Sequence, residues 1–209
     1  MADRRSERPA AATTTEVENA DWYGHDLSGQ SHAQVRFTGA ELTEATNRGA
    51  VFSECTFRDC DFNASTHVDA AFLNYTFAGC SFFDASFSEC KLVGSTFDRC
   101  RFGVLTVSGG DWSLVGLAGA DLRRAALDGV RMREADMTGV RCQGATLRRV
   151  DLAGARLDDA DLSGADLRGS DVSAMDPRNV ELAGAIVDVY QAIAIAGALG
   201  LDVPSDEDA

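Results

Sequence analysis

The stretch "ADLSGADLRGSDV" (160–172) repeats a five-residue unit in which a small residue, a polar residue and a large apolar residue are followed by two others. The large position recurs at every fifth residue from Trp22 to Leu182, and 29 of these 33 positions hold Phe, Leu, Met, Val, Trp or Cys. Two residues earlier, 27 of 33 positions hold Ala, Cys, Ser or Val. One register over such a length indicates a single repetitive domain.

A period of five matches neither regular secondary structure. A helix repeats about every 3.6 residues and a strand every two, so neither keeps such a pattern on one face. The pattern persists if each unit turns a corner and points its large and small residues inward, which predicts a solenoid. Cys60, Cys80 and Cys100 are 20 residues apart, which suggests four units per coil.

The unit resembles the A(D/N)LXX signature of the pentapeptide-repeat family, most closely in "ADLSGADLRGSDV" (160–172) and "ADLRRAALDG" (120–129). Members of that family fold as right-handed quadrilateral β-helices with four units per coil. The resemblance therefore implies an all-β solenoid of pentapeptide repeats over residues 20–186. It specifies the fold more closely than the function, because one fold can carry many functions.

Composition restricts the class of partner. The chain has 33 acidic and 19 basic residues, a net charge of −14, which argues against direct binding of nucleic acid or an anionic membrane. No apolar run approaches the ~20 residues of a membrane span, and the charged N-terminal stretch lacks the pattern of a signal peptide. We therefore expect a cytoplasmic protein with reduced cysteines.

The sequence gives no sign of catalysis, a metal site or a cofactor. Five of the six cysteines occupy the small inward position and Cys142 a large one, where cysteine serves as a buried apolar filler. Their spacing lacks the paired Cys-x2–4-Cys pattern of zinc sites. His32 and His67 fall at large inward positions, which predicts core residues, and no nucleophile–base–acid set is visible.

A narrower resemblance covers nearly the whole chain. The stretches "RGAVFSECTF" (48–57), "CKLVGSTFDRCRFGVLTV" (90–107) and "AGAIVDVYQAIAIAGALGL" (183–201) resemble the mycobacterial fluoroquinolone-resistance (MfpA) group of the family. The last stretch lies outside the repeat, so the repeat alone does not explain it. The resemblance implies a rod-shaped homodimer that imitates duplex DNA, binds DNA gyrase, inhibits or modulates supercoiling and protects against fluoroquinolones.

Charge is concentrated toward the C-terminus. Residues 151–209 carry 13 acidic and 3 basic residues, whereas residues 1–150 carry 20 and 16. Many of the acidic side chains precede a large residue, so we expect them on coil faces at regular spacing, roughly as phosphates lie along a duplex. The predicted partner-binding residues are Asp151, Asp158, Asp159, Asp161, Asp166, Asp171, Asp176 and Glu181.

The C-terminal segment loses the period. "VDVYQAIAIAGALGL" (187–201) predicts a short apolar helix, which Asp188 could cap and Gly200 could end. Such a helix could fold over the open end of the solenoid or pair with a second copy, and the resemblance favours a dimerisation helix. The expected interface residues are Val187, Val189, Tyr190, Ile193, Ile195, Leu199 and Leu201.

The chain therefore divides into a flexible tail (1–19), the β-helix (20–186), the dimerisation helix (187–201) and an acidic tail (202–209). We expect a kink or bulge over 104–116, where Gly110 takes a small position, and a break over 175–179, where Pro177 takes a large one. Two other functions remain open. One is an immunity protein that protects gyrase from a natural toxin, and the other is a structural scaffold for an unrelated protein partner.

Overall fold

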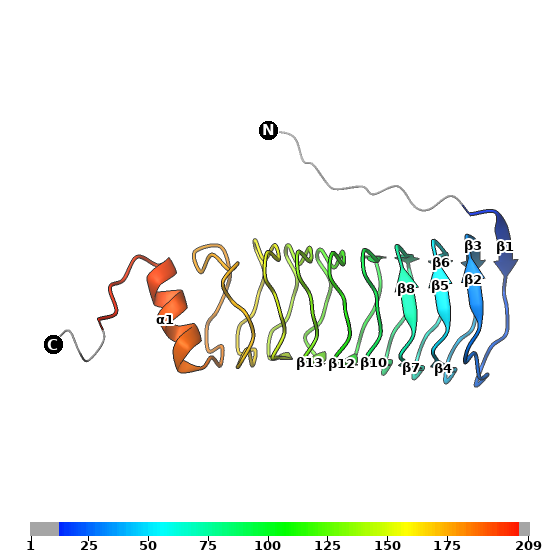
Figure 1. The fold of residues 1–209 in the computed structure, drawn as a ribbon, viewed down its shortest axis with the longest axis horizontal. Helices are drawn as coiled ribbons and strands as arrows, with labels where there is room; N and C mark the ends of the chain where they lie inside the picture. The colour runs from blue at the N-terminus through cyan, green and yellow to red at the C-terminus, as the bar shows by residue number, and fades with distance from the viewer. Residues whose placement is uncertain (1–12, 205–209) are drawn as a thin grey trace.

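The computed structural model describes residues 13–204, which form a parallel β-solenoid with one short helix at its C-terminal end (Figure 1). Each strand pairs in parallel with the strand 20 residues further along the chain, so Phe37 lies beside Phe57 and Phe57 beside Phe77. One coil thus contains four five-residue units. The predicted β-helix of pentapeptide repeats is confirmed.

Three of the four faces carry short strands, because the chain turns a corner after every unit. The first face holds β1 (Thr15–Glu18), β3 (Val35–Thr38), β6 (Thr56–Arg58), β9 (Thr76–Ala78) and β11 (Thr96–Asp98). The second holds β4 (Thr46–Arg48), β7 (Thr66–Val68), β10 (Ser86–Ser88), β12 (Thr106–Ser108), β13 (Ala126–Asp128) and β14 (Thr146–Arg148). The third holds β2 (Ser31–Ala33), β5 (Val51–Ser53) and β8 (Ala71–Leu73). The fourth consists of isolated parallel bridges such as Asp21 to Glu41.

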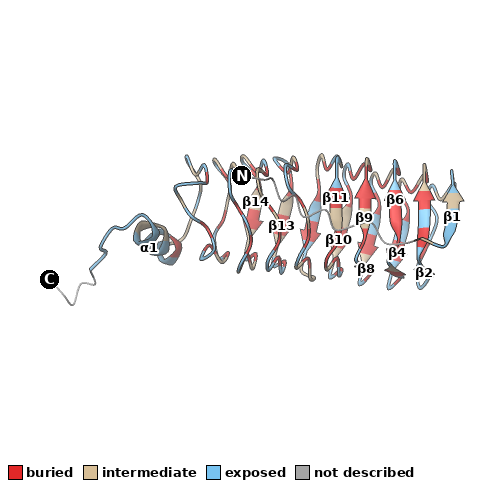
Figure 2. Cartoon of the chain, turned by 90° about the horizontal axis from the view of Figure 1, so that it is seen from above, coloured by how far each residue is buried: buried red, intermediate tan, exposed pale blue. Residues whose placement is uncertain are grey.

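The core is a stack of the large inward residues, and buried positions recur along the whole rod (Figure 2). In the N-terminal half, phenylalanine rings lie directly over one another. The ring centroids are 4.7 Å apart for Phe37 and Phe57 and 4.8 Å apart for Phe77 and Phe97. These distances match the ~4.8 Å spacing of hydrogen-bonded strands. After Trp112 the buried residues are mainly leucine, methionine, valine and alanine.

The small inward positions bring side-chain donors close to the backbone. The Cys60 thiol donates to the carbonyl of Arg58 at 3.2 Å, and the Cys80 thiol donates to that of Phe57 at 3.4 Å. Ser95 donates to the carbonyl of Phe72 in the same way. All six cysteines are free, and only Cys100 is more than slightly exposed. Cysteine here acts as a small core residue with a weak donor.

The kink or bulge expected over 104–116 is present at the N-terminal edge of that stretch, where the isolated bridges run from Asp61 through Ser81 to Arg101 and do not continue to Asp121. Within residues 13–204 the N–H groups of Phe102 and Val104 donate to no backbone acceptor, whereas Phe82 N–H donates to Arg101 at 2.7 Å.

From Thr106 onward the ladder is continuous over this stretch, with Asp111 N–H donating to Cys90 at 3.0 Å and Trp112 N–H donating to Arg131 at 2.7 Å. Glycine allows this continuity at position 110, because a Cβ there would lie 2.2 Å from the Cys90 carbonyl oxygen. Leu105, a large residue in a small position, is buried directly after the interruption, and the 20-residue register resumes at Thr106↔Ala126.

The ladder begins five residues before the predicted boundary. β1 starts at Thr15 and pairs with β3 from Thr15↔Val35 to Glu18↔Thr38. Part of the segment predicted as a flexible tail is therefore the first strand of the solenoid. Residues 1–12 of that tail, and residues 205–209 of the acidic tail, lie outside the described residues.

His67 is a buried core residue, as its inward position predicts. Ser65 Oγ donates to the Phe62 carbonyl at 2.7 Å, so at 3.0 Å it accepts from His67 Nε2. Nδ1 of His67 then accepts from the Asn47 amide nitrogen at 3.4 Å, while the Asn47 oxygen accepts from Ala50 N–H. The imidazole is therefore neutral, and burial lowers its pKa to about 3.

This histidine predicts an acid-sensitive core. The unfolded chain takes up the His67 proton near pH 6.5 and the folded chain near pH 3, so stability is complete above pH 6.5 and falls as the pH decreases through that window. By pH 4.5 the loss is about 2–3 kcal/mol. Urea denaturation of the wild type and of the Asn47→Leu/His67→Phe variant at pH 7 and 4.5 measures this loss in the free energy of unfolding. The variant should lose about 2 kcal/mol less, keeping a smaller slope from half-buried His32, whose pKa burial also lowers. Equal losses in both proteins would show that His67 is not the titrating group.

Candidate functional site

The eight predicted carboxylates lie on all four faces of the last two coils, and we call them the acidic ring. Asp161 and Glu181 are bridge partners on one face, and Asp166 continues the face of β14. Asp151 follows Arg131 on the face that begins with β2, where Asp171 comes one coil later. The remaining three members follow Arg156 on the face of β11: Asp158, Asp159 and Asp176. The arrangement encircles the end of the rod and does not form a single row along it.

Arginines neutralise part of this charge. Arg133 lies 2.6 Å from Asp151, and Asp166 pairs with Arg168 at 2.7 Å and more loosely with Arg148 at 3.8 Å. Asp176 has a loose contact of 3.8 Å with Arg178. Within residues 13–204 no ion pair involves the other five members of the ring: Asp158, Asp159, Asp161, Asp171 and Glu181.

The sequence interpretation missed the arginine partners because it examined the repeat at a period of five. At a period of 20, three faces alternate in sign: Asp111–Arg131–Asp151, Asp121–Arg141–Asp161 and Asp136–Arg156–Asp176. Within these columns Arg131 lies 3.1 Å from Asp111, and Arg141 lies 3.1 Å from Asp121. Stacked coils bring such residues together, and alternation avoids like charges on adjacent strands. Toward the C-terminus the alternation stops, since Glu181 follows Asp161 and Asp171 follows Asp151.

Local hydrogen bonds keep several ring carboxylates ionised. Asp161 accepts from the hydroxyl and N–H of Ser163 at 2.6 and 3.0 Å, and these bonds lower its pKa. Hydrogen bonding from Ser173 lowers the pKa of Asp171 in the same way. The Arg168 guanidinium lowers the pKa of Asp166 to about 2. Asp161, Asp166 and Asp171 therefore stay negatively charged at neutral and mildly acidic pH.

The helix α1 (Val189–Ala198) packs across the end of the solenoid. Its first turn is a capping box, in which the Asp188 carboxylate accepts from Gln191 N–H at 3.0 Å and Gln191 Oε1 accepts from Asp188 N–H at 2.7 Å. Buried Gln191 also donates to the carbonyls of Leu167 and Ser170 at 2.6 and 2.8 Å. These bonds attach the helix to the last complete coil.

The helix shows features of both arrangements that the sequence left open. Val187 and Ile195 are partly buried against the protein's own core, which leaves less of their surface for a second copy, and their place in a dimer interface stays a prediction. Their burial follows from the capping box, which turns that side of the helix toward the rod. The other predicted interface residues are exposed: Val189 by 65%, Tyr190 by 81%, Ile193 by 46%, Leu199 by 44% and Leu201 by 60%.

Gln191 and Ile186 also belong to this end of the molecule, although the repeat pattern does not point to them. Gln191 could have been recognised, because Asp188-x-x-Gln191 is the pattern of a capping box. Ile186 is 47% exposed beside the helix and extends its apolar surface. Over residues 13–204 no cluster of three or more His, Cys, Asp or Glu could hold a metal ion. In the same part of the chain no helix is long and apolar enough to cross a bilayer.

Comparison with known proteins agrees with this geometry. The family model "Pentapeptide repeats" matches eight copies over residues 117–152 and 135–173, and that of the "SV2A/B/C luminal domain" matches residues 12–102. A comparison with curated protein sequences gives no match. The repeats, their 20-residue register and the family match identify the chain as a member of the pentapeptide-repeat family.

Two solved structures illustrate the likeness. QnrB1, described as a plasmid-mediated fluoroquinolone resistance protein, is 18% identical, with a TM-score of 0.50 over 90% of this chain and 99% of that one. HetL, a pentapeptide-repeat protein involved in heterocyst differentiation regulation in the cyanobacterium Nostoc, is 23% identical. Its TM-score is 0.37 over 83% of this chain and 84% of HetL. At 18% identity the likeness to QnrB1 establishes the fold alone.

Proposed function

We propose that this protein is a non-enzymatic DNA mimic that binds DNA gyrase, inhibits or modulates supercoiling and protects the enzyme against fluoroquinolones. The observation that carries the proposal is the acidic ring at the C-terminal end of a rod-shaped β-helix. A basic DNA-binding saddle would attract this end of the rod as it attracts phosphates. The resistance role described for QnrB1, a protein of similar fold, supports the choice of partner.

The mimic requires two copies joined at their C-terminal ends. Each protomer would contribute the exposed side of α1, so that two acidic rings meet at the centre of a longer rod. Residues 151–209 carry a net charge of −10 in each copy (13 acidic, 3 basic), so a dimer concentrates about −20 there. B-DNA carries about one charge per 1.7 Å, and a dense acidic centre approaches that value more closely than the rest of the rod.

Pairing with arginine makes the negative charge uneven along the rod. The alternating columns Asp111–Arg131–Asp151 and Asp136–Arg156–Asp176 cancel much of the charge over the middle coils. The unpaired carboxylates of the ring are therefore the ones that a basic surface would contact first. Their attraction is exposed to solvent, so binding should weaken strongly as salt concentration rises.

Charge reversal tests the mimic. Asp161→Arg/Asp171→Arg changes the charge of each protomer by four units inside the ring. Because the basic saddle would then meet repulsion, the concentration for half-inhibition of gyrase supercoiling should rise at least ~tenfold near 0.1 M salt. The wild type should also reduce ciprofloxacin-induced cleavage. Supercoiling of relaxed plasmid by an actinobacterial gyrase is the measurement.

The matched control for that test is Glu41→Arg/Asp61→Arg. It makes the same change in net charge on adjacent bridge partners far from the ring. This control should retain inhibition to within about twofold. Equal losses in both double variants would mean that overall charge and not the ring matters. Full inhibition by the ring variant would exclude the mimic and favour a scaffold for another partner.

The dimer has its own test in Ile193→Asp. Ile193 is two residues from buried Gln191 and so lies on the opposite side of the helix, where it is 46% exposed. A charge there should leave the monomer folded and disrupt a helix-to-helix contact. Light scattering should then give the monomer mass of 22.2 kDa in place of a dimer mass.

The control for the dimer test is Leu114→Asp. Leu114 is 44% exposed at a distant corner where its φ of 60° tolerates aspartate. This variant should remain dimeric. A wild type that is monomeric, or an Ile193→Asp variant that stays dimeric, would overturn the proposed interface.

A further inference from the structure

The β-ladder opens between the last two coils on two of the four faces. In the preceding coil, Met132, Glu134 and Met137 donate their N–H groups to Asp151, Ala153 and Arg156 at 2.8–2.9 Å. The equivalent donors one coil later are Leu152, Gly154 and Leu157, and within residues 13–204 none of the three has an acceptor. Pairing resumes at Asp159, which donates to Asn179 one residue out of register. The break predicted over 175–179 is therefore present.

The residues on the lifted segment account for the opening. Met175 occupies a small inward position that holds Ala135 and Ala155 in the two coils before it, and it is buried all the same. A larger residue in a close-packed site forces the backbone to move. Pro177 occupies the next large position, where it restricts Asp176 to extended conformations. The segment consequently lifts from the coil below.

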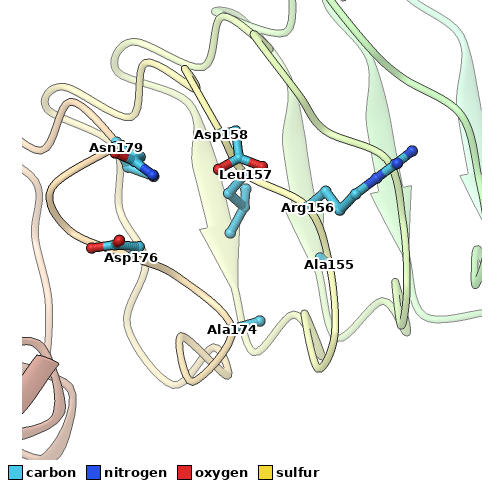
Figure 3. A pocket seen from close by; sticks show the side chains of 8 residues that line it. Ala155, Arg156, Leu157, Asp158, Ala174, Asp176 and Asn179 are labelled. Carbon is cyan, nitrogen blue, oxygen red and sulfur yellow. The ribbon is translucent and has the colours of Figure 1, made fainter. Parts of the chain in front are cut away.

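A cavity of about 180 Å³ lies at this opening. Its apolar lining comes from Ala155, Leu157, Ala174 and Val180. Figure 3 shows Asp158 beside Leu157 on one segment and Asp176 and Asn179 on the facing segment, while the Arg156 side chain extends away from them. That arginine pairs with Asp136 of the preceding coil at 2.5 Å, so its charge is engaged elsewhere.

We propose that this cavity receives an arginine or lysine side chain from an extended segment of the protein partner. The methylene stem would lie on Leu157 and Ala174, and the charged head would lie between the carboxylates of Asp158 and Asp176. The cavity equals about six waters at roughly 30 Å³ each, enough for one long side chain. The unpaired Leu157 N–H offers a hydrogen bond to the main chain beside that side chain.

Charge selects a basic occupant over an apolar one. Asp158 has no ion pair within the described residues, and Asp176 has only the loose contact of 3.8 Å with exposed Arg178. The neighbouring ring members Asp159 and Asp161 add to the negative potential at the opening. A buried N–H group without an acceptor costs free energy. A main-chain carbonyl of the partner that accepted from the Leu157 N–H would therefore also remove that cost. The inference deepens the proposed function and rests on it only for the identity of the partner.

NMR titration of the full chain with acetyl-Ala-Arg-Ala-amide tests the site. The Leu157 and Val180 methyl groups and the Leu157 amide should shift, whereas the citrulline peptide, which is neutral and of similar shape, should bind at least ~tenfold more weakly. Asp158→Asn/Asp176→Asn should weaken arginine-peptide binding roughly tenfold. Asp84→Asn is the matched control, because it removes one exposed charge at a corner more than three coils away, and it should change binding by less than about twofold.

Two further measurements keep the test decisive. Hydrogen exchange should be at least ~100-fold faster at the amides of Leu152, Gly154 and Leu157 than at those of Met132, Glu134 and Met137. Binding of the peptide should slow the exchange of the Leu157 amide. Ala174→Leu fills the cavity without changing charge and should abolish the methyl shifts. Equal affinity for the arginine and citrulline peptides, or undiminished binding to Ala174→Leu, would overturn the site. Inhibition of supercoiling by the same wild-type protein is assayed separately. Failure to bind the arginine peptide would contradict the cavity site, whereas failure to inhibit gyrase would contradict the proposed function.

Discussion

Everything in this structure depends on the hydrogen-bonded stacking of one coil on the next at a register of 20 residues. That register places each large residue over its equivalent, as Phe37 lies over Phe57 with 4.7 Å between ring centroids. It also determines which surface charges are neighbours, because residues 20 apart share a face and lie ~4.8 Å apart. Core packing, the alternating Asp and Arg columns and the opening near Pro177 are all consequences of that one constraint.

The period of five was sufficient to predict the fold, the inward residues and the role of His67. It could not show which side chains meet, because Asp111 and Arg131 become neighbours only once four units close a coil. At Gly110 the ladder is continuous because glycine there admits the Cys90 backbone, and the expected irregularity lies instead beside Leu105, at Phe102 and Val104. Val187 and Ile195 are partly buried against their own chain, an orientation that the sequence of an apolar helix does not reveal. Here the capping box of Asp188 and Gln191 determines that orientation.

The C-terminal end of the rod differs from the rest in its unpaired backbone groups and carboxylates. Along most of the rod, backbone donors and acceptors are used between coils and many surface carboxylates are paired with arginine. Near the C-terminal end both kinds of pairing are interrupted, the backbone ladder on two faces over Leu152–Leu157 and the charge pairing at the ring carboxylates that have no arginine partner. The exposed side of α1 adjoins the same end. Charge, apolar surface and open hydrogen-bonding groups thus coincide where a partner would contact the protein.

Competition between this protein and DNA for gyrase is the most direct measurement of the proposed mimicry. Fluorescence anisotropy of a labelled duplex bound to gyrase, titrated with the unlabelled protein at 50 and 200 mM salt, would report it. A mimic should displace the duplex completely, and should do so at least ~tenfold less effectively at the higher salt concentration. If the protein bound gyrase while the duplex stayed in place, or displaced it equally well at both salt concentrations, electrostatic imitation of DNA would be wrong.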